Sequence, residues 1–179
     1  MVENSSQVNI QAVLPEQLEL LASLARQAYL DHFTYLWHDE GAWYSKYSFA
    51  SGTLEKEMAD DNNRFFMAWL NAFPVGFLKL RLDQPLGEIP GSRAMELERI
   101  YLLSSAAGKG IGKALLRHAE TMARQYRKEI LWLKAMDSSQ EAIAFYQRNG
   151  FNICGSHRLD FPVMKEEYRG MLILEKTLE

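Results

Sequence analysis

The sequence predicts a mixed α/β domain built around one central sheet. Two alternating apolar runs, at 64–70 and 75–82, are separated by turn-forming residues and indicate a hairpin. The second half of the chain alternates strand patterns with helical ones, which favours some parallel pairing there. Between these two parts lies the stretch SSAAGKGIGKALL (104–116), in which three glycines stand where a helix should begin.

Composition sets the class of protein. With 179 residues, 47% of them hydrophobic, the chain fits a single domain over 1–179. A formal net charge of -3 gives no reason to expect nucleic-acid binding or attraction to an anionic membrane. No apolar run approaches the roughly 20 residues of a membrane span. The single cysteine excludes an internal disulfide and fits a reducing compartment, so we expect a cytoplasmic protein.

Apolar spacing and breaker residues predict the elements of the first half. A strand over 8–13 precedes a helix that begins at Pro15 and runs to about Tyr29. The aromatic-rich segment 29–49 is expected to form short helices with a loop. The remaining expected elements are a helix near 53–58, strands at 64–70 and 75–82 with a turn at 71–74, and a loop at 83–92.

The second half is expected to begin with a strand over 94–103. The helix that follows the glycines runs to about Tyr126, and a strand spans 129–136. Ser138 and Glu141 have the spacing of a capping box at the start of the next helix, and Gly150 is placed to end it. Two further strands begin at 151 and cover 170–177.

The glycine stretch has the properties of an anion site. The first turn of a helix has unpartnered amides and the positive end of the helix dipole. Glycine at 108, 110 and 112 would let a diphosphate approach those amides closely. The nucleotide-binding patterns fit poorly, because Ala114 stands where a phosphate loop needs Ser or Thr, and Lys113 where a dinucleotide fold needs glycine. A flexible turn without a ligand is the alternative.

Two motifs resemble those of the GNAT superfamily of acetyl-CoA-dependent N-acetyltransferases. The family signature [QR]-x-x-G-x-[GA] matches residues 107–112, with Ala107 where the family has Gln or Arg. The later motif N-x-x-A-x-x-F-Y-x-x-x-G-F departs only at its first position, and its places are filled by Ser139, Ala142, Phe145, Tyr146, Gly150 and Phe151. The resemblance implies a mostly antiparallel sheet of about seven strands with one splayed parallel pair, flanked by helices.

The resemblance also implies a site for acetyl-CoA and no metal. The backbone of the strand around 100–102 would pair with the pantetheine amides, and the glycine stretch would hold the diphosphate. The cofactor-binding residues it implies are Ile100, Tyr101, Leu102, Ala107, Gly108, Lys109, Gly110, Ile111, Gly112, Lys113, Ser139 and Tyr146.

Three residues are candidates for the chemistry. The resemblance implies that Tyr146 donates a proton to the departing thiolate; a core tyrosine is the alternative. Glu96 and Glu98 alternate along their strand, so we expect them to share a face with Ile100 and Leu102. Either carboxylate could accept the amine proton, and salt bridges to neighbouring arginines are the alternative.

Other reactive side chains are expected to be structural. Cys154 lies in the apolar run FNIC, so we expect a buried, inert thiol rather than an acetylated nucleophile. His118 is expected at the edge of the core. His32 and His38 lack a metal-ligand pattern.

The resemblance places the acceptor pocket in residues 29–49 and the loop 83–93. Tyr29, Phe33 and Trp37, together with Glu98, are the expected substrate-binding residues. The rings and the acids Asp31, Asp39 and Glu40 suit a cationic amine, although ordinary helix packing explains them equally well.

The run ELERIY…AIAFY, with GSH further on, also resembles the bacterial polyamine acetyltransferases of the PaiA kind. Spermidine or spermine is therefore the leading expected acceptor, with a small-molecule amine as partner and a homodimer compatible with the family. The alternatives are a GNAT enzyme acting on protein amines or aminoglycosides, a non-catalytic acyl-CoA-binding regulator, and a plain nucleotide-binding module.

Overall fold

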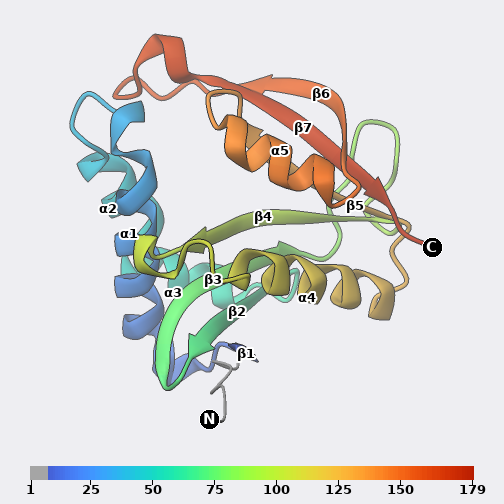
Figure 1. Ribbon diagram of the computed structural model, residues 1–179, viewed down its shortest axis with the longest axis horizontal. Helices are drawn as coiled ribbons and strands as arrows, with labels where there is room; N and C mark the ends of the chain where they lie inside the picture. Colours follow the sequence, from blue (N-terminus) through green and yellow to red (C-terminus); the bar gives the residue numbers. More distant parts are fainter. Residues whose placement is uncertain (1–7) are drawn as a thin grey trace, which may run out of the picture.

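The computed structural model describes residues 8–179, which form one seven-stranded sheet in the order β1-β2-β3-β4-β5-β7-β6 (Figure 1). The strands are β1 (Val8–Ala12), β2 (Asn63–Leu70), β3 (Phe73–Arg81), β4 (Ala94–Leu102), β5 (Ile130–Met136), β6 (Asn152–Arg158) and β7 (Gly170–Thr177). The helices are α1 (Leu18–Phe33), α2 (Ala42–Phe49), α3 (Ser51–Ala59), α4 (Ile111–Gln125) and α5 (Gln140–Arg148). Short 3-10 turns cover 15–17, 34–36, 104–106 and 166–168.

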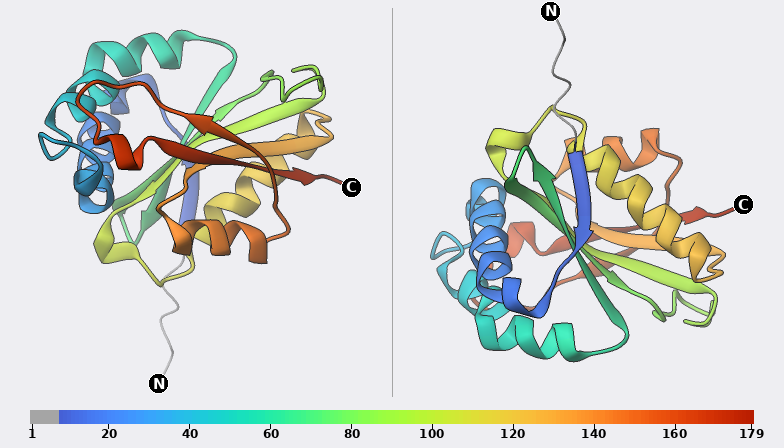
Figure 2. Two further views of the ribbon diagram at one scale, coloured as in Figure 1. Left: turned by 90° about the horizontal axis from the view of Figure 1, so that it is seen from above. Right: turned by 90° about the horizontal axis from the view of Figure 1, so that it is seen from below.

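Helices cover the sheet on both faces (Figure 2). Helices α4 and α5 pack on one face over a core that includes Leu78, Leu97 and Ile111. Helices α1, α2 and α3 cover the other face of the first four strands, over a second core that includes Phe49 and Phe77. No helix within residues 8–179 is both long and apolar enough to cross a membrane.

Strands β4 and β5 form the parallel pair of the sheet, and they pair over only part of their length. Residues 94–97 of β4 align with 130–133 of β5, and beyond this point the two strands separate. On its other edge β4 has an irregularity at the same place: Leu80 of β3 aligns with Leu97 and Lys79 with Arg99, which leaves Glu98 without a partner residue. An extra residue of this kind bends a strand and increases its twist. The splayed parallel pair is confirmed.

The C-terminal strand is inserted between its two predecessors. Strand β7 pairs antiparallel with both β5 and β6, so the strand–helix–strand unit β5-α5-β6 does not join neighbours in the sheet. Strand β6 is consequently an edge strand, and six of its seven residues are exposed.

Local features agree with the sequence in most places. Asn71 and Ala72 form the β2–β3 turn with positive φ angles of 55° and 81°, which suits a tight hairpin. Gly150 ends α5 with a φ of 89°. The predicted capping box is wrong: α5 is preceded by Ser139, no side chain caps it, and the Ser138 hydroxyl instead lies 2.8 Å from that of Tyr35.

Candidate active site

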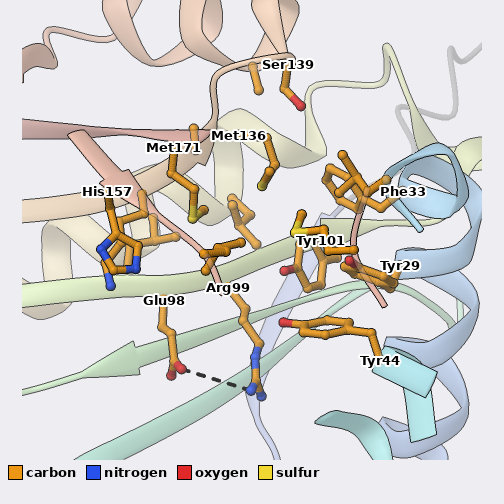
Figure 3. Close-up of a pocket in the computed structure, with 18 of the residues that line it drawn as sticks. Tyr29, Phe33, Tyr44, Glu98, Arg99, Tyr101, Met136, Ser139, His157 and Met171 are labelled. Carbon is orange, nitrogen blue, oxygen red and sulfur yellow. Dashed lines mark ion pairs between the residues drawn. The ribbon is translucent and has the colours of Figure 1, made fainter. Parts of the chain in front are cut away.

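A cavity of about 280 Å³ opens where β4 and β5 separate (Figure 3). Helices α1 and α2 form one side of it, strands β4, β5 and β7 the sheet side, and the start of α5 a third side. The expected site residues that line it are Tyr29, Phe33, Trp37, Glu96, Glu98, Ile100, Tyr101, Ser139 and Tyr146. Leu102 and residues 107–113 lie outside its lining. The roles of all these residues remain predictions.

Aromatic rings make up the helical wall of the cavity. Trp37 is buried, and its Nε1 donates a hydrogen bond of 2.8 Å to the Tyr29 hydroxyl. The rings of Trp37 and Tyr44 stack with centroids 4.9 Å apart. Tyr101, expected from its backbone alone, also points its ring into this space (Figure 3). The wall is therefore apolar and rigidly packed.

The segment 159–168 packs against this aromatic wall and contributes to the cavity lining. Its main chain is bonded to the turn after α1: the His38 amide donates to Val163, and the Lys165 amide donates to Leu36. Phe161 and Met164 from this segment add apolar surface to the lining.

A cluster of four charged side chains holds β4 where it bends. The guanidinium of Arg99 donates to both carboxylate oxygens of Glu57 in α3, at 2.8 and 3.1 Å. Lys79 of β3 lies 3.1 Å from Glu57 and forms a second ion pair with Glu98. Arg99 and Lys79 are almost fully buried. Bidentate geometry between arginine and carboxylate is the strong form of an ion pair, so α3 fixes the bend firmly.

The expected face of the two glutamates is wrong in one respect. Because Glu98 is the extra residue of the irregular strand, alternation is broken there: Ile100 and Leu102 pack against the core under α4 and α5, whereas Glu96 and Glu98 pair with Arg81 and Lys79 of β3. Ile100 still borders the cavity at its edge. Sequence alternation alone could not reveal the extra residue.

The two carboxylates differ in their proton affinity. Burial raises the pKa of Glu96, although Lys134 at 3.6 Å and Arg81 at 3.3 Å oppose the shift. Burial would also raise the pKa of Glu98, but the charges of Arg99 and Lys79 outweigh it and hold that pKa below its ordinary value. Glu96 is therefore the better proton acceptor of the two.

Tyr146 lies on α5 with its ring buried, on the side of the cavity that faces away from α1. Burial raises the pKa of its phenol, so the hydroxyl keeps its proton at neutral pH. Ser139 precedes the first residue of the same helix and lines the same space (Figure 3).

The glycine stretch has the geometry of an open amide cradle. Gly108 and Gly110 have φ angles of 73° and 76°, and a Cβ built on either would meet nothing within 4 Å. Gly110 immediately precedes α4. Within residues 8–179, no backbone amide from 108 to 113 donates to a main-chain carbonyl. These amides are therefore available to an anion.

Helix α1 is bonded to the strand end that leads into this cradle. Asp31 accepts a hydrogen bond of 2.8 Å from the Ser104 amide, which lowers the pKa of its carboxyl. His32 Nε2 lies 2.8 Å from the Leu102 carbonyl. That carbonyl, one of the groups expected to pair with pantetheine, is thus already bonded within the chain.

Several expectations about the surroundings of the site are wrong. The loop 83–93 does not contribute to the cavity lining, and neither do Asp31, Asp39 and Glu40. Cys154 is exposed rather than buried, because β6 lies at the edge of the sheet. Partial burial of its sulfur and the nearby charge of Glu175 still raise the pKa of its thiol.

The expectation for His118 agrees with the structure. His118 is partly buried at the core edge, with its ring 4.4 Å from that of Phe66. Among residues 8–179, no three His, Cys, Asp or Glu side chains are grouped to hold a metal.

Sequence reasoning missed the basic residues of the cavity. Arg99 and Lys134 line it, and Arg99 is bonded to Glu57 of α3, far away in sequence. The only signal available was alternation of charge along ELER, which gives no partner on another element.

Comparison with known proteins decides the family. Residues 22–151, which include the cradle, the β4 bend and Tyr146, match the model of the Acetyltransferase (GNAT) family. The chain belongs to the GNAT family. It is therefore an N-acetyltransferase whose cosubstrate is acetyl-CoA.

The relatives of this GNAT chain differ in what they are named for. An uncharacterized N-acetyltransferase from Lactobacillus delbrueckii is 30% identical over 70% of each chain. A spermidine N(1)-acetyltransferase from Thermoplasma acidophilum is 25% identical over 90% of this chain and 98% of its own. The crystal structure of the PaiA N-acetyltransferase of Thermoplasma acidophilum with coenzyme A has a TM-score of 0.74, at 22% identity over 96% and 99% of the two chains.

The charged cluster at the bend should contribute strongly to stability. We expect Glu57→Gln to lower the free energy of unfolding by roughly 2 kcal/mol, because it leaves Arg99 and Lys79 buried with too little negative charge. Urea unfolding measures the change. In the control Glu129→Gln, which breaks an exposed pair with Arg93, stability should stay close to that of the parent. Equal stability of the two variants would contradict the prediction.

Proposed function

We propose that the protein transfers the acetyl group of acetyl-CoA directly to the primary amine of a small molecule while both are bound. The observation that carries this is the cavity at the β4–β5 separation, lined on one side by aromatic rings of α1 and α2 and on the other by Tyr146. In this reaction the amine nitrogen bonds to the acetyl carbon, the carbon–sulfur bond breaks, the amine loses a proton and the thiolate gains one. Acetyl-CoA supplies an activated acyl group.

The chain has suitable groups for the anionic part of the coenzyme. Among residues 8–179, the six amides of 108–113 donate to no main-chain carbonyl, the space beside Gly108 and Gly110 is open, and the positive end of the α4 dipole lies there. Ala107 lacks the polar side chain usual at this place in the family, so the main chain carries the binding. Ile100, Tyr101 and Leu102 are proposed to line the pantetheine arm, with Ser139 beside it.

Two side chains are proposed to move protons. The phenol of Tyr146 lines the cavity and carries its proton at neutral pH, so it can donate that proton to the departing thiolate. The carboxylate of Glu96 can accept the amine proton through a water molecule, since burial raises its proton affinity. Glu98 is held by Arg99 and Lys79, so we assign it to charge balance at the bend.

The acceptor is a small-molecule amine that enters between Tyr29, Phe33 and Trp37. The Thermoplasma relative is named for spermidine, and this supports a polyamine among the candidates. Another relative, 38% identical over 64 residues, is a streptothricin acetyltransferase of Streptomyces lavendulae, which adds antibiotic amines to the candidates.

Removing the phenol hydroxyl should slow the chemical step. We expect Tyr146→Phe to lower kcat by about 100-fold, the usual size of one proton-transfer contribution, with acetyl-CoA affinity nearly unchanged. Thiol release measures kcat, and isothermal titration measures affinity. Unchanged kcat would remove Tyr146 from this role, and binding without turnover in the parent protein would favour a non-catalytic regulator.

Removing the proton acceptor should change the pH dependence. A base must be deprotonated, so activity of the parent should fall as the pH drops through the raised pKa of Glu96. We expect Glu96→Gln to lose this acidic limb and about 100-fold in kcat/KM. A profile that keeps its shape in Glu96→Gln would show that another group accepts the proton.

Blocking the cradle should weaken coenzyme binding alone. We expect Gly110→Val to reduce acetyl-CoA affinity by about tenfold or more, since one hydrogen bond to a charged group contributes about 1.5–3 kcal/mol. Gly87→Val is the matched control, because Gly87 also has a positive φ and open surroundings but lies in the loop 83–92. Equal loss in both variants would indicate general strain rather than a binding site.

A further inference from the structure

We propose that the acceptor is a monoamine, with one basic nitrogen on an aromatic or long aliphatic body. This inference rests on the proposed function, which requires an amine but does not specify it. It follows from how the charges of the cavity are used and from what the rest of the lining is made of.

Every carboxylate that lines the cavity is already paired with cations. Glu96 is almost fully buried, with Lys134 at 3.6 Å and Arg81 at 3.3 Å. Glu98 pairs with Lys79 and lies 4.0 Å from Arg99. Cations of the chain therefore already compensate the negative charge of both carboxylates.

The charge around the cavity also has the wrong sign for a polycation. Together with Glu57, which pairs with Arg99 and Lys79, the cluster contains four bases and three acids. A second ammonium group on the acceptor would lose its hydration shell without gaining an ion pair with a carboxylate. It would also lie next to a cluster with a net positive charge. Contact with an aromatic face compensates only a small part of that loss.

The acidic residues Asp31 and Asp39 of the aromatic segment accept hydrogen bonds from backbone amides. Asp31 accepts the hydrogen bond from the Ser104 amide. Asp39 accepts bonds from the amides of Gly41 and Trp43, at 3.1 and 2.7 Å, and so stabilises the start of α2. Neither residue lines the cavity. The acidic residues that favoured a polyamine from sequence therefore do not provide an anionic pocket.

The lining suits an apolar body. Besides the rings of α1 and α2, the side chains of Met136, Met164 and Met171 face the cavity, and methionine adapts to ligands of different shape. A flat ring or an alkyl chain would fill this surface without leaving buried polar groups unpaired.

The aromatic surface continues out of the cavity. The ring of Phe161 lies 5.6 Å from that of Trp43, which stacks on Tyr47 at 4.9 Å and 8°. Trp43 and Tyr47 are 37% and 58% exposed. We assign this strip to the distal end of the acceptor.

A monoamine is also suited to the reaction. Only the neutral amine attacks a thioester, and an apolar cavity disfavours the ammonium form. A single nitrogen bound against this lining therefore loses its proton more easily than in water, whereas a second charged nitrogen would keep the ligand hydrated and outside.

The test compares amines with one, two and three basic nitrogens, and hexylamine and 1,6-diaminohexane form the matched pair. Thiol release is measured with hexylamine, 1,6-diaminohexane, 2-phenylethylamine and spermidine at fixed acetyl-CoA. We expect kcat/KM for hexylamine to exceed that for 1,6-diaminohexane by about 100-fold, with 2-phenylethylamine above both and spermidine lowest. A value for the diamine or spermidine equal to or above that of the monoamines would overturn the inference.

Binding separates this inference from the proposed function. Calorimetry measures the same amines with the protein saturated by coenzyme A. Selective binding of the monoamines without turnover would support the inference and overturn the proposed function. Absence of selective monoamine binding would overturn the inference, whether or not turnover occurs.

A variant tests the charge argument directly. We expect Lys134→Met, which removes one of the two cations beside Glu96, to shift the ratio of diamine to monoamine kcat/KM toward the diamine by about tenfold. Lys176→Met is the matched control, since Lys176 pairs with Glu120 on the α4 side of the sheet, outside the cavity lining. A ratio unchanged in Lys134→Met, or changed equally in both, would overturn the charge argument.

Discussion

The separation of β4 from β5 is the constraint on which the site depends. Two parallel strands that are bonded only over 94–97 leave a gap in the sheet, and the cavity occupies that gap. A gap inside a sheet leaves backbone groups without their usual hydrogen bonds, so other interactions must keep the two strands apart. The unpaired Glu98 bends β4 away, and the bidentate bond from Arg99 to α3 keeps the bend in place. Helix α3, which covers the same face of the sheet as α1 and α2, thus helps to keep the cavity open.

The sequence predicted the elements well and their partners less well. The start of α4 after the glycines, the hairpin at 71–72 and the last strand depend on local signals, such as glycine and alternation, and they lie where expected. The first helix begins at Leu18 rather than Pro15, because a 3-10 turn precedes it. The insertion of β7 between β5 and β6 has no local signal, because pairing between strands is decided by distant residues. The burial of Cys154 was mispredicted for this reason, since an apolar strand run does not show whether the strand is central or at an edge.

The site, too, has a part that the sequence predicts and a part that it does not. The aromatic residues of α1 follow helical spacing and meet at the cavity as expected from the sequence. The charges do not, because which cation neutralises Glu98 depends on a residue of β3 and on one extra residue in β4. An acidic residue in a sequence therefore says little about the charge of a pocket until its partners are known. In this protein the difference decides whether the proposed acceptor is a polycation or an apolar amine.

Helix α1 takes part in both halves of the molecule at once. Tyr29 and Phe33 face the cavity, while Asp31 and His32, on the same two turns, bind the strand end before the glycine stretch. Remodelling the cavity side of α1 would therefore disturb the approach to the glycine stretch as well. Helix α2 and the segment 159–168 also border the cavity, and the segment is bonded to the turn after α1. Substitutions in these two parts should disturb the glycine stretch less than substitutions in α1. Divergence of acceptor preference among relatives should accordingly concentrate in those two segments.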